Sequence, residues 1–428
     1  MYRQKATYTI AEGQYHILKQ QMLNWANRFS ISLFLDSNHY VDKYSRYSCL
    51  LACDAIDTVT GLTSLQEQYN AKPDWWLGHI CYDYKNQLEP KLSSKKGYAS
   101  GWGNTELCFF NPRYVLYTNP DCISLTIETI DIEPGEVLAQ IQTVKPQEEN
   151  MLPRLDFTKR IEKERYLDSI KRLQQHIVDG DCYEINYCVE GYTKAKGLNT
   201  LAVYNSLCQL SPAPFSAYYR TGNLSMMCAS PERYLRKEGN VIMSQPIKGT
   251  AKRDADTAKD EQNKKELAAS IKERAENVMI VDLVRNDLAR SCETRSVHVD
   301  ELFGIYSFPQ VHQMISTVSA ELKKDAEFTD AIKYSFPMGS MTGAPKIKVM
   351  ELIERYEQSR RELFSGTVGY VTPNGDFDFN VIIRSLFYNA SKGYLSYQTG
   401  GAITYGSIPE QEWEEMRLKA WALERIFS

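Results

Sequence analysis

Residues 224–250 read LSMMCASPERYLRKEGNVIMSQPIKGT, and this stretch predicts antiparallel strands at the centre of the fold. Short apolar runs lie on both sides of Glu238-Gly239-Asn240, and a Gly-Asn step between such runs is typical of a hairpin turn. We therefore expect two strands joined at this turn, with the chain continuing beyond Pro246 toward a second turn at Gly249-Thr250.

One lysine in this stretch has an unusual position. Lys248 falls between a predicted strand and the Gly249-Thr250 turn. It is either a solvated turn charge, which the usual exposure of lysine favours, or an amine held in place for chemistry. A placed amine attacks only in its neutral form, so its pKa would have to fall from the reference value of about 10.4.

Glu232 lies near the start of the partner strand in the predicted hairpin. If the hairpin forms, its carboxyl and the amine of Lys248 could meet on one surface. That pairing is what a general acid working beside a nucleophile requires.

The pattern of strands and helices continues on both sides of this stretch. Helices are predicted over residues 158–179, 258–289 and 408–427, from apolar residues at helical spacing and from residues typical of helix ends. A further hairpin is predicted over 377–397. In its first strand, alternation places Arg384 on the face opposite the most continuous apolar side chains.

The composition changes about a third of the way along the chain. Residues 1–130 contain short β-like runs separated by turn-forming residues, whereas residues 131–156 are rich in proline and polar side chains, including Gln147-Glu148-Glu149-Asn150. We place a boundary near residue 152, with a strand-rich region at 1–152 and a second region at 153–428. The boundary marks a change in composition more than an independent unit.

Two pairs of glutamates have the same spacing on predicted helices. Glu273 and Glu276 lie on one helix, and Glu412 and Glu415 lie on the last. A spacing of three residues puts both members of a pair on one helix face. Each pair alone is best explained as a solvated acidic face. Together, the two pairs could hold Mg²⁺, which needs only one or two carboxylates. Spacing does not show whether the two faces meet.

A glycine-rich loop, FPMGSMTGAPK at residues 336–346, runs into a predicted helix. It is not a Walker loop, because Ala344-Pro345 separates the glycine from Lys346. Backbone N–H groups ahead of a helix still suit a carboxylate, and Gly400-Gly401-Ala402 could form a second such cradle. With Arg384 and Lys346, these features could bind a small dianion.

The overall composition excludes several classes of protein. The 428 residues carry 50 basic and 54 acidic side chains, a net charge of −4, which offers no general attraction for nucleic acid or an anionic membrane. No apolar run is long enough to span a bilayer, and the N-terminal residues lack a signal-peptide pattern. The ten cysteines include no C-x-x-C motif, so we expect reduced thiols in a cytoplasmic protein without zinc.

These motifs, in this order, resemble the chorismate-utilising enzymes, which include anthranilate synthase component I, aminodeoxychorismate synthase component I, and the isochorismate and salicylate synthases. The resemblance covers residues 155–427. It is carried by Ser230-Pro231-Glu232, Pro246-Ile247-Lys248-Gly249-Thr250, the run from Arg274 to Asp287, the loop from Gly339 to Lys346, Ile383-Arg384-Ser385 and Gly400-Gly401-Ala402. The first part of the chain resembles the family more loosely.

The resemblance implies an α+β fold in which two large antiparallel sheets pack face to face with helices outside. Lysine between Pro246-Ile247 and Gly249-Thr250 is typical of the aminodeoxychorismate synthase branch, whereas alanine is typical of the other branches. The branch implies amination of chorismate at C4 to give 4-amino-4-deoxychorismate, a precursor of p-aminobenzoate and folate. The alternatives are anthranilate synthase component I and a non-catalytic family member.

The resemblance also implies roles for individual residues. Lys248 would attack C2 of chorismate, and Glu232 would protonate the C4 hydroxyl as it leaves. Mg²⁺ would be held by Glu276 and Glu415, assisted through water by Glu273 and Glu412. The residues implied to contact substrate are Thr250, Thr342, Gly343, Lys346, Arg384, Gly400 and Gly401.

The remaining expectations concern partners and a second site. No cysteine has the Gly-x-Cys-x-Gly context of an amidotransferase nucleophile, so ammonia would come from a separate glutamine amidotransferase subunit. Some relatives bind tryptophan, and the matching residues here would be Ser37, Tyr44, Ser45, Arg46 and Tyr47. Two positions depart from the commonest family pattern, Gln313 and Ala402.

Overall fold

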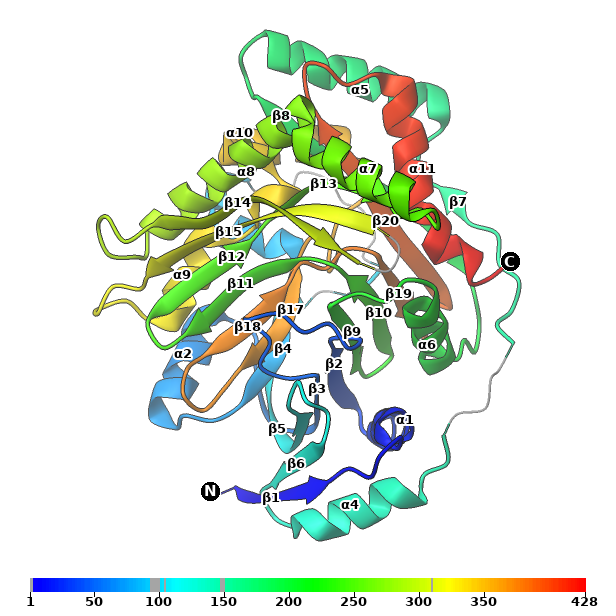
Figure 1. The fold of residues 1–428 in the computed structure, drawn as a ribbon, viewed down its shortest axis with the longest axis vertical. Helices are drawn as coiled ribbons and strands as arrows, with labels where there is room; N and C mark the ends of the chain where they lie inside the picture. The colour runs from blue at the N-terminus through cyan, green and yellow to red at the C-terminus, as the bar shows by residue number, and fades with distance from the viewer. Residues whose placement is uncertain (1–2, 93–100, 104, 147–150, 309–310) are drawn as a thin grey trace.

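A computed structural model describes residues 3–92, 101–103, 105–146, 151–308 and 311–428 (Figure 1). Part of the predicted linker, residues 147–150, lies outside these described residues. Helices lie on the outside of a central body of strands, with β1 and α4 at one end of the molecule and α5 and α11 at the other (Figure 1).

Antiparallel strands form the framework of the described chain. The strands are β1 (Gln4–Thr9), β2 (Ile31–Asp36), β3 (Cys49–Val59), β4 (Trp76–Ile80), β5 (Leu107–Thr118), β6 (Ser124–Thr129), β7 (Thr158–Lys159), β8 (Glu184–Lys194), β9 (Phe215–Thr221), β10 (Leu224–Ser230), β11 (Arg233–Glu238), β12 (Val241–Gln245), β13 (Ile247–Lys252), β14 (His298–Ser307), β15 (Val311–Glu321), β16 (Gly343–Ala344), β17 (Thr367–Val371), β18 (Phe377–Asn380), β19 (Ser385–Asn389) and β20 (Tyr394–Ile403). Every pairing between these strands is antiparallel.

The helices cover the outside of this framework. They are α1 (Tyr15–Ala26), α2 (Leu62–Ala71), α3 (Lys85–Leu88), α4 (Pro134–Thr143), α5 (Lys163–Val178), α6 (Thr200–Leu210), α7 (Thr257–Ala269), α8 (Ile271–Ala289), α9 (Phe328–Ser335), α10 (Lys346–Tyr356) and α11 (Pro409–Arg425). Single 3₁₀ turns occupy Tyr82–Tyr84, Pro90–Leu92 and Gly339–Met341.

The hairpin predicted within residues 224–250 is confirmed. β11 and β12 pair from Glu238 opposite Val241, which leaves Gly239 and Asn240 as a two-residue turn. Gly239 has φ of 57°, the left-handed backbone that this tight turn needs and that glycine adopts without strain.

Three sequence predictions were wrong in detail. Gly249-Thr250, predicted as a turn, lies within β13. The helix predicted over 258–289 is two helices, because Ser270 leaves helical geometry and accepts a hydrogen bond from the N–H of Glu273 (3.3 Å), which caps α8. The strand predicted through 377–384 ends at Asn380, and Arg384 has φ of 53° just before β19 begins. This break changes the direction of the chain and re-aims the arginine.

Both faces of the central sheet are buried, which explains its apolar strands. Leu33 of β2 and Met226 of β10 belong to the largest apolar cluster, which also contains side chains from β4, β11, β15, β17 and β18. Their neighbours Phe34 and Met227 point the other way, into a cluster with α1, α4, α6 and α11. The α+β fold with facing antiparallel sheets and outer helices is confirmed, and the strand pairings join the sheets into one continuous network.

Strand pairing crosses the composition boundary near residue 152. β2 pairs with β3 on one side and with β9 on the other, and β4 pairs with both β5 and β17. The N-terminal third therefore contributes strands to the same sheet network as the rest of the chain.

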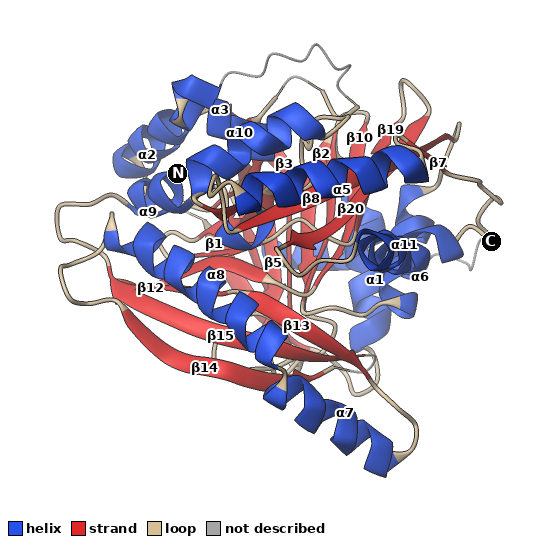
Figure 2. Cartoon of the chain, turned by 90° about the horizontal axis from the view of Figure 1, so that it is seen from above, coloured by secondary structure: helices blue, strands red, loops and turns tan. Residues whose placement is uncertain are grey.

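Helix α8 lies across the layer formed by β12, β13 and β15, as the view from above shows (Figure 2). Helix α11 packs on β20, and Figure 1 shows α8 and α11 at the same end of the molecule. The predicted acidic helix faces are thus carried by helices that cover neighbouring parts of the sheet.

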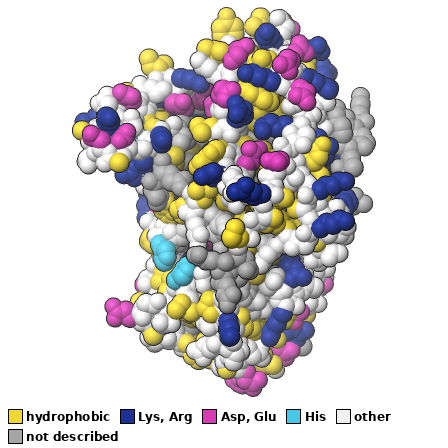
Figure 3. Space-filling model, turned by 90° about the vertical axis from the view of Figure 1, so that its right-hand side faces the viewer, with side chains coloured by type: hydrophobic (Ala, Val, Ile, Leu, Met, Phe, Trp, Pro, Cys, Tyr) yellow, Lys and Arg dark blue, Asp and Glu magenta, His cyan; other side chains and the backbone are white. Residues whose placement is uncertain are grey.

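All ten cysteines are free, and seven of them are buried. Within the described residues, no helix is both long and apolar enough to cross a membrane. Acidic and basic side chains are interspersed over the face seen in Figure 3, in keeping with the small net charge.

Candidate active site

The side chain of Lys248 is buried between β13 and β8. Its Nζ donates a hydrogen bond of 2.5 Å to Oε1 of Glu184, and the two side chains are 10% and 1% exposed. Proline lacks an N–H, so Pro246 separates β12 from β13, and the pairing with β15 slips between Ile247 and Thr250. The lysine therefore leaves the strand ladder and turns inward, and the interpretation as a solvated turn charge is wrong.

The surroundings of Lys248 favour its charged form. Burial opposes the ammonium, but the carboxylates of Glu184, Glu276 and Glu232 outweigh burial, so the pKa of Lys248 is raised above its ordinary value. A nucleophilic lysine needs a lowered pKa, and the free protein does not meet that condition. The lysine must lose a proton before it can attack.

Glu232 is a buried carboxyl near this lysine, in the short link between β10 and β11. Burial raises its pKa to about 7, although the hydroxyl of Ser340, the charge of Lys248 and the N–H of Ile247 each lower it. Its backbone is held because Val381 donates an N–H to its carbonyl (3.0 Å). A carboxyl with such a pKa holds its proton near neutral pH, which suits a general acid.

The two acidic helix faces meet near the same lysine. Burial raises the pKa of Glu276 to about 7, and Lys248 opposes this shift. Burial also opposes ionisation of Glu415, but neighbouring lysines, Lys248 among them, keep its pKa below its ordinary value. Lys272 acts on Glu276, Glu412 and Glu415 alike. Glu276 of α8 and Glu415 of α11 therefore lie close enough to interact with the same two lysines, Lys248 and Lys272. Spacing in the sequence could not establish this proximity.

The donor set of this site fits a hard divalent cation. Within the described chain, no three His, Cys, Asp or Glu side chains form a ready-made metal cluster. Mg²⁺ does not need one, because it is held by one or two carboxylates and takes its other ligands from water and substrate. Burial raises the pKa of Glu276, and a bound divalent cation would favour its ionised form. Glu276 and Glu415 are therefore suitable ligands, and Glu273 lies at the start of the same helix face.

Arg384 is the best-placed receptor for an anion in this region. Burial lowers its pKa, and Glu415 is the charge that opposes this effect. Among the described residues its guanidinium has no hydrogen bond or ion pair in the structure. A desolvated guanidinium of this kind is suited to bind a carboxylate from a ligand.

Gly400 and Gly401 lie on β20, beside α11. A Cβ at Gly401 would lie 3.3 Å from Oε2 of Glu412 and 3.6 Å from Oε1 of Glu415. A Cβ at Gly400 would lie only 2.1 Å from the carbonyl oxygen of Tyr187, so glycine is needed there for β20 to pair with β8. Lys419 donates to the carbonyl of Gly400 (2.8 Å). The glycine pair thus borders the carboxylate cluster.

The glycine-rich loop pairs with β8 beside the site. The hydroxyl of the buried Thr342 donates to the carbonyl of Met338 (3.1 Å), and Gly343 pairs with Ile185 of β8. Nζ of Lys346 donates to Asp287 (2.6 Å) and to two backbone carbonyls, which uses all three of its N–H groups. A substrate contact by Lys346 would require these bonds to break. Thr250, on the strand after the lysine, is exposed.

Glu184 was not among the residues predicted from the sequence, although its carboxylate contacts the amine of Lys248. The one available signal was a carboxylate at the start of a strand whose first eight residues are all buried. Buried carboxylates are rare unless they are paired. Its partner lies 64 residues further along the chain, and no local pattern predicts that pairing.

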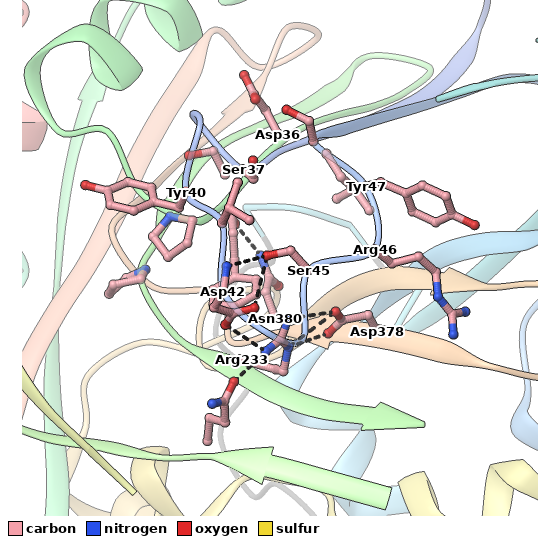
Figure 4. Close-up of a pocket in the computed structure, with 18 of the residues that line it drawn as sticks. Asp36, Ser37, Tyr40, Asp42, Ser45, Arg46, Tyr47, Arg233, Asp378 and Asn380 are labelled. Carbon is pink, nitrogen blue, oxygen red and sulfur yellow. Dashed lines mark hydrogen bonds and ion pairs between the residues drawn. The ribbon is translucent and has the colours of Figure 1, made fainter. Parts of the chain in front are cut away.

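A second site is a cavity of about 250 Å³ on the far side of the hairpin from Lys248. The loop between β2 and β3 closes over it, and Figure 4 shows Asp42 and Ser45 of this loop above the Arg233–Asp378 ion pair (2.9 Å). Of the residues predicted for a tryptophan site, Ser37, Ser45, Arg46 and Tyr47 line the cavity, and Tyr44 does not.

The cavity shares a wall with the candidate active site. Arg233 and Ile247 line the cavity, and each is the chain neighbour of a residue on the other side, Glu232 and Lys248. The hydroxyls of Ser37 and Tyr40 are buried in the cavity wall and have no hydrogen-bond partner among the described residues. Unpaired buried hydroxyls are costly, so they indicate a place where a polar ligand could bind.

Known proteins resemble this chain along most of its length. An aminodeoxychorismate synthase of Arabidopsis thaliana chloroplasts is 34% identical over 81% of this chain and 39% of its own length. Aminodeoxychorismate synthase component 1 of Escherichia coli K12 is 35% identical over 67% of this chain and 62% of its own length. The chain therefore spans less than two thirds of the length of these relatives.

A solved structure confirms the fold. Anthranilate synthase component I of Streptococcus pneumoniae superposes with a TM-score of 0.78, covering 90% of this chain and 94% of that protein at 22% identity. At this identity the likeness concerns the fold alone. The model of the chorismate binding enzyme family matches residues 27–425, which is nearly the whole chain, and this protein therefore belongs to the family of chorismate binding enzymes.

Proposed function

We propose that this protein aminates chorismate at C4 and releases 4-amino-4-deoxychorismate, the precursor of p-aminobenzoate. The observation that carries the proposal is the buried amine of Lys248 next to the protonatable carboxyl of Glu232, inside a ring of carboxylates. Relatives of similar sequence named aminodeoxychorismate synthase support the same chemistry. A binding protein would not need a buried amine that shares its surroundings with a second carboxyl, Glu232, whose pKa is raised to about 7.

Substrate binding is proposed to use both positive groups and metal. Glu276 and Glu415 would hold Mg²⁺, with Glu273 and Glu412 assisting through water, and the bound ion would neutralise and fix the ring carboxylate of chorismate. The guanidinium of Arg384, together with the N–H groups of Gly400 and Gly401, would bind the enolpyruvyl carboxylate. An acidic protein can thus bind a dianion through a local positive field.

The reaction is proposed to proceed in two substitutions. Neutral Lys248 forms a bond to C2, both ring double bonds shift, and the C4 hydroxyl leaves as water with the proton from Glu232. Ammonia then forms a bond to C4, both double bonds shift back, and the C2–N bond breaks to return the amine. Dividing one difficult substitution into two easier ones is the usual benefit of covalent catalysis.

Ammonia is proposed to come from a separate glutamine amidotransferase. The relative from Escherichia coli is named as component 1 of its enzyme, which supports a second component. The sequence lacks a Gly-x-Cys-x-Gly amidotransferase motif. We also propose that the protein works in the cytoplasm, where its ten free thiols would stay reduced.

In the decisive experiment, the purified protein is incubated with chorismate and Mg²⁺, and the product is identified by mass and chromatography. With an ammonium salt we expect 4-amino-4-deoxychorismate, and with glutamine alone we expect none. Anthranilate and pyruvate as products would overturn the proposal in favour of an anthranilate synthase. Unchanged chorismate in the presence of ammonium would overturn it in favour of a non-catalytic protein.

The pKa of Glu232 predicts the alkaline side of the pH profile. Glu232 must be protonated to act as an acid, and burial raises its pKa to about 7, so kcat/KM should be constant below pH 7 and fall above it. Glu232→Gln should lower kcat/KM by about 10²–10⁴-fold and remove that fall. The profiles should be measured at saturating Mg²⁺, so that Glu276 stays ionised. An unchanged alkaline limb in the variant would assign the limb to another group.

The cavity is proposed to bind tryptophan. Its volume and its aromatic and polar lining, including Tyr40, Phe215 and Ser37, suit an aromatic amino acid. Sequence does not decide whether such binding is structural or inhibitory, and the same assay run with and without tryptophan separates these roles.

Tryptophan at 100 times its Kd should raise the unfolding midpoint of this chain by roughly 3 °C, since such binding contributes about 2.7 kcal/mol. Ser45→Phe, which fills the cavity, should remove the shift. Tyr44→Ala is the matched control, because Tyr44 lies in the same loop but outside the cavity lining. A scan in which tryptophan moves neither the wild type nor the control would exclude this ligand.

A further inference from the structure

Glu184 is the acceptor that directly contacts the amine of Lys248. Their hydrogen bond of 2.5 Å joins Oε1 of Glu184 to Nζ, and the glutamate side chain is only 1% exposed. This is the one hydrogen bond that Nζ makes to a described residue. A proton leaving the ammonium therefore has a ready path to this carboxylate.

The backbone around Glu184 is held firmly by the glycine-rich loop. Tyr183 donates its N–H to the carbonyl of Ala344, and Asn186 donates its N–H to the carbonyl of Thr342, both at 2.8 Å. Gly343 has φ of 140°, and a Cβ there would lie 2.1 Å from the carbonyl oxygen of Glu184. Only glycine permits this close approach, so the loop motif fixes the carboxylate beside the lysine.

The second oxygen of Glu184 is also informative. Oε2 is buried and has no hydrogen-bond partner among the described residues. A buried carboxylate normally satisfies both oxygens, because an unpaired acceptor is costly. Lys248 is therefore the one hydrogen-bond donor that this carboxylate has among the described residues.

The other carboxyls that face Lys248 have different tasks in the proposed reaction. Glu232 must hold its own proton for the leaving hydroxyl, and Glu276 and Glu415 would be engaged by Mg²⁺. These three act on the lysine through their charge. Of the facing carboxyls, Glu184 alone is both in contact with Nζ and uncommitted.

We propose that Glu184 is the base that takes a proton from the ammonium of Lys248 and so releases the amine that attacks C2 of the substrate. The inference rests on the proposed function, in which Lys248 is the nucleophile. The ammonium gives one proton to the carboxylate, leaving a neutral amine and a carboxylic acid. The amine lone pair then forms the C2–N bond, both ring double bonds shift as the C4–O bond breaks, and Glu232 protonates the departing oxygen to give water.

The second half of the reaction restores each group. Ammonia forms the C4–N bond as the C2–N bond breaks, and that electron pair returns to Nζ. The new C4 ammonium gives a proton to the Glu232 carboxylate, and Glu184 returns its proton to Lys248. The sum is chorismate plus ammonia giving 4-amino-4-deoxychorismate plus water, with no oxidant or reductant required.

The test measures formation of the covalent adduct between protein and chorismate, with Mg²⁺ but without ammonium, by rapid quenching and intact-protein mass. We expect Glu184→Gln to slow adduct formation at pH 7 by at least about 100-fold. The variant must lose the lysine proton to solvent, so below the pKa of its lysine the ratio of its rate to that of the wild type should rise about tenfold for each pH unit. Glu232 titrates in both proteins, so its effect on the two rates cancels in this ratio.

Two further variants complete the design. Glu184→Asp keeps a carboxylate, so its rate of adduct formation should be lower than that of the wild type by a factor that does not depend on pH. This variant also keeps the inference testable if Glu184→Gln folds poorly. Glu190→Gln is the matched control, because Glu190 is buried on the same strand but contacts Arg160 and Tyr394. We expect the control to form the adduct at the wild-type rate.

The outcomes separate the two proposals. If the wild type forms an adduct and Glu184→Gln forms it equally fast, or more slowly by a factor that is independent of pH, the base role of Glu184 is wrong and the nucleophile stands. A pH-dependent ratio for Glu184→Asp would also overturn the base role. If the wild type forms no adduct at any pH, Lys248 is not a nucleophile, and both proposals fail.

Discussion

Lys248→Ala is expected to lower ammonia-dependent turnover of chorismate by more than about 10³-fold, because the variant lacks the nucleophile of the first substitution. The covalent adduct should disappear from the mass spectrum at the same time. Product formation is measured with saturating chorismate, Mg²⁺ and ammonium. Turnover at the wild-type rate would show that amination does not pass through the lysine.

Loss of the lysine also lowers the stability of the fold, so further variants are needed as controls. Removing one member of a buried ion pair costs about 3–5 kcal/mol, because Glu184 would be left without its partner. Lys248→Arg keeps a positive charge beside Glu184 but supplies a guanidinium that stays protonated and does not attack. It should fold and remain inactive. Lys252→Ala, at an exposed position on the same strand, should be fully active.

Glu276→Gln and Glu415→Gln are each expected to raise the Mg²⁺ concentration for half-maximal turnover by at least about 100-fold. Each substitution replaces an anionic ligand with a neutral amide of the same shape, so metal affinity falls while packing is kept. Turnover is followed during Mg²⁺ titration. Glu414→Gln is the control, because Glu414 is exposed on the same helix and pairs with Arg417. An unchanged Mg²⁺ response in both variants would remove the metal assignment.

Glu276→Gln should lower activity without lowering the stability of the fold. Burial raises the pKa of Glu276 from 4.5 to about 7, so above pH 7 the folded protein holds a carboxylate that the unfolded chain accommodates more easily. Its ionisation therefore destabilises the fold, and Glu276→Gln should unfold at the same or a higher temperature at pH 8 without Mg²⁺. A stable but inactive variant is the signature of a group kept for function.

Local chemistry made several parts of the fold predictable. The Gly-Asn turn and its flanking apolar runs predicted the β11–β12 hairpin, and helical periodicity predicted α5. The capping pattern and the proline at its start predicted α11. The break between α7 and α8 was also readable, because Ser270-Ile271-Lys272-Glu273 has the spacing of a helix N-terminal cap. The single-helix prediction failed because periodicity was weighed above this cap.

Other features depended on contacts between distant parts of the chain. The strand alternation that placed Arg384 assumed a continuous strand, whereas backbone bonds between Ile382 and Gly366 and between Ser365 and Ile382 help to shape a break before β19. The raised pKa of Lys248 depends on carboxylates from three other elements. Local sequence carries no information about such neighbours.

By itself, the sequence determined the family, the antiparallel α+β character and the residue types of the candidate site, because turns, periodicity and ordered motifs are properties of short segments. Only the tertiary structure decided that α8 and α11 bring their glutamates to one lysine, and that Glu184 lies against its amine. The protonation of a buried group depends on how much water is removed and which charges surround it. Both are set by chain segments far apart in sequence, so they exist only once the sheet has formed.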